Sequence, residues 1–173
     1  FIKAKSLWGK RRYSDALTEI NNTLDRDPGY DERVEALVLK GDILLSLGKY
    51  EESLSTYNIA KGINDKLFWA WYGIARSQYN LGNYQESIEA INTALDISPT
   101  DTDANAFKSM LVSIGDDVRV DEAAKYYKAA EESYLAGDYK TSRENYVKSK
   151  NLYTELGDQE KVNLINSKIS AID

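Results

Sequence analysis

The sequence predicts an all-α protein made of short helix hairpins that stack on one another, and three observations support this prediction. Only two prolines and ten glycines interrupt a chain of 173 residues rich in Ala, Leu, Ile, Lys, Glu and Asn, which favours long helices. A seven-residue pattern recurs after 34 residues. Apolar residues around both copies recur at helical spacing, and a single hairpin is too thin to bury its apolar stripe alone.

The repeat is clearest around two glycines. Residues 47–53 (LGKYEES) recur as residues 81–87 (LGNYQES). Further along each copy, Gly41 corresponds to Ala75 and Ala60 corresponds to Ala94. Small residues at these positions allow neighbouring helix backbones to approach closely. The 34-residue unit is therefore expected to be one packed supersecondary element that the chain uses more than once.

Each unit is predicted to be two helices joined by a tight turn. Gly48 and Gly82 are expected to end the first helix, because glycine adopts the left-handed conformation of a helix cap without steric cost. Pro28 and Pro99 follow the second helix of two units, where a helix is expected to stop.

The order of these residues resembles the tetratricopeptide repeat family. The matching positions are Trp71, Ala75, Leu81, Gly82, Tyr84, Ala94 and Pro99 in residues 68–101, and Leu37, Gly41, Gly48, Tyr50, Tyr57 and Ala60 in residues 34–67. Ser87 stands where the family usually has alanine, and Asp65 replaces the terminal proline. The resemblance implies a right-handed α-solenoid of stacked antiparallel helix hairpins, a superhelix of about ten helices.

We expect residues 1–173 to form a single array of this type. It begins with a partial first repeat at 1–33, continues with repeats at 34–67 and 68–101 and a degenerate repeat at 102–136, and ends with a degenerate repeat or capping helices at 139–173. The chain begins with Phe1 rather than methionine, so we expect a segment of a longer protein.

The C-terminal half departs from the 34-residue period. Residues 136–139 (AGDY) imitate the turn, but their spacing from residues 81–84 is neither one period nor two. We predict helices at about 102–114, 120–136, 139–155 and 159–172, with a loop over 115–120 that absorbs the additional residues. In the alternative, residues 120–155 form one repeat flanked by unpaired helices.

Composition argues against catalysis in this segment. The chain has neither cysteine nor histidine, so it lacks thiolate chemistry, sulfur-ligated zinc and the commonest general acid and base. Glycines occur singly at helix ends, so no phosphate-binding loop is expected. Acidic pairs such as Asp116 and Asp117 are better explained as solvated surface. We expect no enzyme activity, no metal and no cofactor.

Charge and hydropathy restrict the partners. With 22 basic and 28 acidic residues the chain carries a net charge of −6, which repels nucleic acid and anionic lipid. The longest apolar stretch, residues 67–75, is far shorter than the ~20 residues that a membrane helix needs, so no membrane insertion is expected. A cytoplasmic location is favoured, although no residue pattern identifies the compartment.

One helix face carries the candidate binding residues. Trp69, Tyr72, Arg76 and Tyr79 recur at a spacing that places them on one side of the same helix. Tyrosine, tryptophan and arginine are enriched at binding hot spots. The family resemblance implies that this face lines a concave groove, together with Lys5, Trp8, Glu35, Asp42, Leu45, Asp103 and Met110. The alternative is that these rings only pack between repeats.

The predicted function is a protein-interaction adaptor or scaffold that binds a peptide or helical segment of a partner protein in the concave groove. We expect that Glu35 and Asp42 are available for a cation of the partner beside the aromatic wall. The alternative function is a structural scaffold that assembles with itself into a homo-oligomer through the array ends or convex faces.

Overall fold

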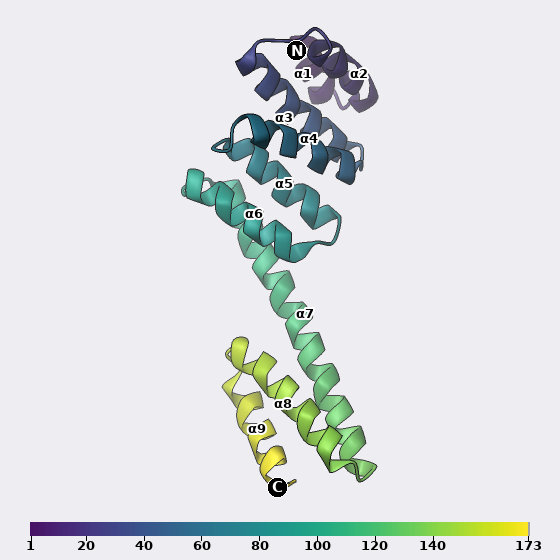
Figure 1. Ribbon diagram of the computed structural model, residues 1–173, viewed down its shortest axis with the longest axis vertical. Coiled ribbons are helices and arrows are strands. Elements are labelled where there is room, and N and C mark those ends of the chain that lie inside the picture. The colour runs from purple at the N-terminus through teal and green to yellow at the C-terminus, as the bar shows by residue number, and fades with distance from the viewer. Residues whose placement is uncertain (173) are drawn as a thin grey trace. The chain divides into compact units, whose positions relative to one another are not determined.

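The computed structural model describes residues 1–172, and this part of the chain is helical and contains no strand (Figure 1). Its nine helices are α1 (Ile2–Gly9), α2 (Tyr13–Leu24), α3 (Tyr30–Ser46), α4 (Tyr50–Ile63), α5 (Phe68–Asn80), α6 (Tyr84–Ile97), α7 (Thr102–Leu135), α8 (Tyr139–Glu155) and α9 (Gln159–Ser170). The predicted all-α fold of stacked hairpins is confirmed, with nine helices in the described residues instead of about ten.

The chain divides into two compact units, residues 1–111 and residues 112–173. In the first unit each helix from α1 to α6 packs on the next one, and α3 also contacts α5. Consecutive helices form antiparallel hairpins that stack side by side (Figure 1). The assignment of both units to a single array, with the repeat boundaries given above, stays a prediction.

Two of the hairpin turns of the first unit depend on the left-handed glycines that the sequence predicts. Gly48 has a φ of 72° and Gly82 a φ of 81°. Residues with a β-carbon rarely adopt such positive φ values. Directly after the first turn, the backbone amide of Lys49 donates to the carbonyl of Leu44 at 2.9 Å. Each glycine therefore ends one helix and reverses the chain into the next.

Buried serines join the two helices of a hairpin. The hydroxyl of Ser53 donates to the carbonyl of Gly41 at 2.9 Å, and that of Ser87 donates to the carbonyl of Ala75 at 2.7 Å. Both serines are fully buried. Serine at the family's alanine position is therefore a functional part of the packing, because it anchors the second helix to the backbone of the first.

The loop predicted over residues 115–120 is wrong, since α7 is one continuous helix from Thr102 to Leu135. The expected helices 102–114 and 120–136 are thus parts of the same element. Gly115 alone does not break the helix, because an interior glycine costs only about 1 kcal/mol and no proline follows it. An ion pair between Arg119 and Asp116 at 2.6 Å spans one turn at this point and supports the helix.

The second unit forms around its own core. The last part of α7, together with α8 and α9, contributes Ala123, Ala130, Tyr146, Tyr153, Val162, Ile165 and Ile169 to one apolar cluster. Gly137, with a φ of 79°, makes the turn between α7 and α8. Residues 120–155 therefore contain a helical hairpin, and α9 packs on its second helix.

Candidate functional site

A groove crosses one face of the first unit. It consists of two adjoining pockets with volumes of about 690 and 460 Å³, and both are lined by Trp8, Val38, Asp42 and Trp69. The remaining lining residues are Phe1, Lys5, Gly9, Val34, Glu35, Leu39, Leu67, Tyr72, Gly73, Arg76 and Asp103. Nearly all of them belong to α1, α3, α5 and the start of α7, the first helices of successive hairpins. We call this surface the first groove.

Eight of the eleven predicted binding residues line the first groove: Lys5, Trp8, Glu35, Asp42, Trp69, Tyr72, Arg76 and Asp103. The other three lie elsewhere. Leu45 is 8% exposed and belongs to the core. Tyr79 packs against Tyr84 and Phe107, with ring centroids 5.9 and 5.7 Å away. Met110 is exposed but borders neither pocket.

Aromatic rings form the wall of the first groove. Trp69 is 55% exposed and Trp8 is 36% exposed, unusually high values for the largest apolar side chain. Tyr72 is held in place by stacking on Phe68, with ring centroids 5.7 Å apart, and by an edge contact with Phe107. The wall therefore combines a fixed ring with two tryptophans that are open to a ligand.

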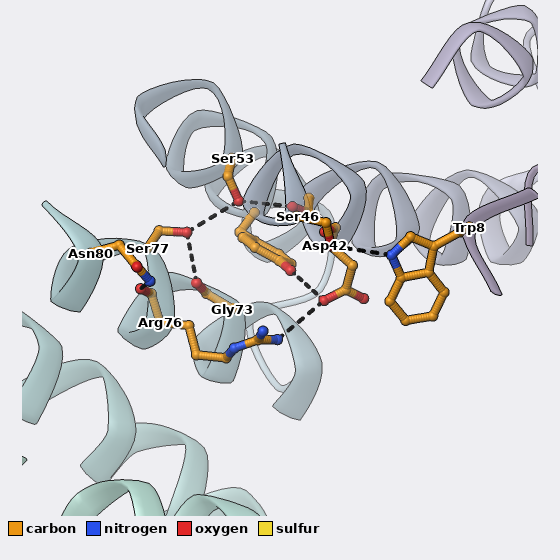
Figure 2. Close-up of polar contacts among 10 residues, drawn as sticks. Trp8, Asp42, Ser46, Ser53, Gly73, Arg76, Ser77 and Asn80 are labelled. Carbon is orange, nitrogen blue, oxygen red and sulfur yellow. Dashed lines mark hydrogen bonds and ion pairs between the residues drawn. The ribbon is translucent and has the colours of Figure 1, made fainter. Parts of the chain in front are cut away.

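Asp42 and Arg76 form the charged floor of the first groove, and a buried tyrosine contacts Asp42. The hydroxyl of Tyr57 donates to Oδ1 of Asp42 at 2.8 Å, and Nη1 of Arg76 lies 3.5 Å from the same oxygen. Figure 2 shows the Asp42 carboxylate between Arg76 on α5 and Trp8 on α1. The Arg76 guanidinium also lies 5.8 Å from the centroid of the Tyr72 ring, a cation–π distance.

Two glycines give the Tyr57 ring its place. A β-carbon on Gly41 of α3 or on Gly73 of α5 would lie within 2.8 Å of ring atoms of Tyr57. The ring is 1% exposed. Both helices can therefore approach the tyrosine only because they carry no side chain there, and this close packing aims the hydroxyl at Asp42.

Glu35 and Asp42, which we expect to meet a partner's cation, each have a cation of the chain itself beside them. Arg76 already pairs with Asp42, and Nζ of Lys5 lies 3.9 Å from Oε2 of Glu35. Asp103 is exposed and makes no ion pair with any residue from 1 to 172. Asp103 is thus the carboxylate of the first groove that has no ion pair within residues 1–172.

Burial raises the pKa of Asp42 above its ordinary value of 3.8, although the hydrogen bond from Tyr57 and the charge of Arg76 act in the opposite direction. The folded protein therefore holds this proton more tightly than the unfolded chain does. We expect the contribution of Asp42 to the stability of the first unit to fall as the pH rises from 3.8 through the folded-state pKa of Asp42. In the Asp42→Asn variant this part of the pH dependence should disappear.

Urea unfolding followed by tryptophan emission over this pH range measures the effect, because all three tryptophans lie in the first unit. Asp103→Asn, which removes an exposed carboxylate of the same groove, is the matched control and should keep the slope. If Asp42→Asn unfolds with the same pH profile as the unaltered chain, the buried carboxyl does not contribute to the slope.

Residues 1–172 contain no group of three or more carboxylates placed to hold a metal ion. None of their helices is both long enough and apolar enough to cross a bilayer.

Comparison with known proteins identifies the repeats. Tetratricopeptide repeat models match residues 3–66 and residues 68–101, which together make up more than half of the chain. No curated protein sequence matches the chain significantly. The matched segments contain most residues of the first groove, but not Phe1, Leu67 and Asp103.

Solved structures with this fold share little sequence with the chain. A Podosopora anserina putative kinesin light chain with nearly identical TPR-like repeats has a TM-score of 0.57 at 12% identity, with 98% of this chain and 90% of that chain covered. MamA has a TM-score of 0.54 at 15% identity, with 98% and 93% covered.

A structure of Naa15/Naa10 bound to HypK-THB contains a chain that matches with a TM-score of 0.56 at 20% identity. The match covers 99% of this chain but only 24% of that one, so the present chain spans about a quarter of its length. At these identities the likeness concerns the fold. The two repeat models, which together match more than half of the chain, show that the chain belongs to the tetratricopeptide repeat family.

Proposed function

We propose that the first groove binds an extended or helical segment of a partner protein, and that the chain acts as a non-catalytic adaptor. Membership of the tetratricopeptide repeat family supports a general role as a protein-interaction scaffold. The observation that carries the specific proposal is the pair of exposed tryptophans, Trp8 and Trp69, that line the same groove. Large apolar side chains that face a groove are typical anchors for a ligand.

The charges of the first groove support a ligand that has apolar side chains and one basic residue. Lys5 and Arg76 are paired within the chain, so neither is fully available to an anion. Asp103 makes no ion pair with any of the described residues and lies in the same pocket as Trp69 and Tyr72. A lysine or arginine of the ligand could contact this carboxylate while its stem packs on the rings. We therefore propose a segment with an apolar anchor and a neighbouring basic residue.

Two tryptophans separated by one residue provide a matched test. Trp69 faces the first groove, whereas the indole of Trp71 donates to the carbonyl of Asp65 at 2.7 Å and packs under Lys61. Binding segments can be selected from a random peptide library on the full chain and then titrated calorimetrically. Trp69→Ala is expected to weaken their binding about 30-fold, as loss of a hot-spot residue does, and Trp71→Ala by less than about threefold.

Circular dichroism checks that both variants keep their helix content, and light scattering checks that binding does not reflect self-association. The proposal fails if the selected segments lack apolar and basic residues, or if Trp69→Ala binds them as tightly as the unaltered chain. A chain that forms oligomers and selects no segment would instead support the alternative of a self-assembling scaffold.

A further inference from the structure

The second unit repeats a backbone contact of the first unit, although the matched repeats end at residue 101. The hydroxyl of Ser142 on α8 donates to the carbonyl of Ala130 on α7 at 2.9 Å. In the first unit Ser53 and Gly41 make the same contact at the same distance, and each pair is separated by 12 residues. The hairpin formed by α7 and α8 is therefore built like the hairpin formed by α3 and α4.

The tyrosine–carboxylate contact is repeated as well. Tyr146 on α8 donates its hydroxyl to Oε1 of Glu131 on α7, as Tyr57 on α4 does to Oδ1 of Asp42 on α3. In both cases 15 residues separate the partners. Both tyrosines are 1% exposed. Glu131 thus occupies the place that Asp42 has in the first groove.

A cation from the following helix completes both arrangements. Nζ of Lys168 on α9 lies 2.9 Å from Oε1 of Glu131, and Nη1 of Arg76 on α5 lies 3.5 Å from Oδ1 of Asp42. With respect to this contact, α9 has the same position relative to the hairpin α7–α8 as α5 has relative to the hairpin α3–α4. The face of the second unit that carries Glu131 and Lys168 corresponds to the first groove.

The corresponding face has a different chemistry. When Lys168 is aligned with Arg76, Lys161 takes the position of Trp69 and Leu164 takes that of Tyr72. The spacing of 161, 164 and 168 places all three on one side of α9. On α7, Tyr127 lies one turn before Glu131 and packs on the core edge. We call Tyr127, Glu131, Lys161, Leu164 and Lys168 the basic face.

Positive charge prevails on the basic face. Its one carboxylate, Glu131, is engaged by Tyr146 and Lys168, and these hydrogen bonds lower its pKa, so it stays ionised and paired. Lys161 is exposed and makes no ion pair with any of the described residues. Beside it Leu164 is 43% exposed. An unpaired cation next to an exposed leucine complements a ligand that is acidic and partly apolar.

We propose that the basic face is a second binding site, which takes an acidic polypeptide segment with interspersed apolar side chains. The proposal is independent of the first groove, whose available charge, Asp103, has the opposite sign. A nucleic acid is the less favoured anion, because a long polyanion would also meet the field of a chain with a net charge of −6. A short acidic segment carries fewer charges and meets less of this repulsion.

Fluorescence anisotropy on the full chain tests the proposal with a labelled, amidated peptide of repeating Glu, Glu and Leu. Lys161→Glu is expected to weaken binding about tenfold, because an attraction becomes a repulsion. Lys140→Glu is the matched control, since it makes the same charge change at an exposed residue of α8 that is not part of the basic face. Its effect should stay below about twofold.

Further measurements distinguish binding at the basic face from binding elsewhere on the chain. The Trp69→Ala variant should bind the acidic peptide as tightly as the unaltered chain does. The test of the basic face therefore does not depend on whether the first groove binds a ligand. The proposal is overturned if the acidic peptide does not bind, if Lys140→Glu weakens binding as much as Lys161→Glu, if a matched Lys, Lys, Leu peptide binds equally well, or if an oligouridylate binds more tightly than the acidic peptide.

Discussion

Replacing Gly73 by alanine is expected to lower the free energy of unfolding of the first unit by about 2 to 3 kcal/mol. The new β-carbon would lie 2.2 to 2.5 Å from three atoms of the Tyr57 ring. The ring cannot retreat, because Gly41 packs on it almost as closely and its hydroxyl is bonded to Asp42. The added methyl group therefore has to push α5 away from α4, and this displacement also disturbs the floor of the first groove.

Gly62→Ala is the matched control for this prediction. Gly62 lies in α4, and a β-carbon there meets nothing within 4 Å. Since alanine favours helix more than glycine does, this change should be neutral or stabilise by up to about 1 kcal/mol. Urea unfolding followed through Trp8, Trp69 and Trp71 measures both variants. Equal stability of Gly73→Ala and the unaltered chain would mean that the ring has room to move.

Replacing Tyr146 by alanine is expected to destabilise the second unit by about 3 to 5 kcal/mol. Tyr146 is 1% exposed and is one of the largest side chains in a small core that also contains Ala130, Tyr153 and Ile165. Removal of the ring leaves a cavity between α7 and α8 and takes the hydroxyl away from Glu131. Hydrogen exchange of the backbone amides of α8 and α9 measures the loss.

The Tyr146→Phe variant separates the ring from the hydroxyl. Phenylalanine keeps the ring, so the core stays filled and only the hydrogen bond to Glu131 is lost. Because Lys168 still pairs with that partly exposed carboxylate, we expect a loss of about 1 kcal/mol. If alanine and phenylalanine at this position reduce the protection of the amides equally, packing of the ring is not what stabilises the second unit.

Much of the fold could be predicted because its signals are local. Gly48 and Gly82 mark the turns by a conformation that only glycine adopts easily, and both have a positive φ. The continuous helix α7 was missed for the converse reason. A single glycine such as Gly115 weakens a helix by only about 1 kcal/mol. The pair of Arg119 with Asp116 recovers about 0.2 to 0.5 kcal/mol of this cost.

The first groove could be predicted only in part. Helical spacing places Trp69, Tyr72 and Arg76 on one side of α5, and the structure brings them to one pocket. Spacing cannot show how deeply a residue is covered, so Leu45 was expected in the groove although it lies in the core. The hydrogen bond between Tyr57 and Asp42 joins two helices, and no local sequence pattern predicts it.

The fit of the Tyr57 ring between Gly41 and Gly73 also limits which repeats could be duplicated or exchanged within this chain. In a tandem duplication of residues 34–67, the second copy would present Leu39 at the position that Gly73 now occupies, directly against the ring. In residues 68–101 the tyrosine's position holds the smaller Ile91, and the bulky Phe107 follows at the glycine's position. The two repeats thus place their large and small side chains at opposite positions of this contact, so one repeat cannot replace the other without a steric clash or a cavity.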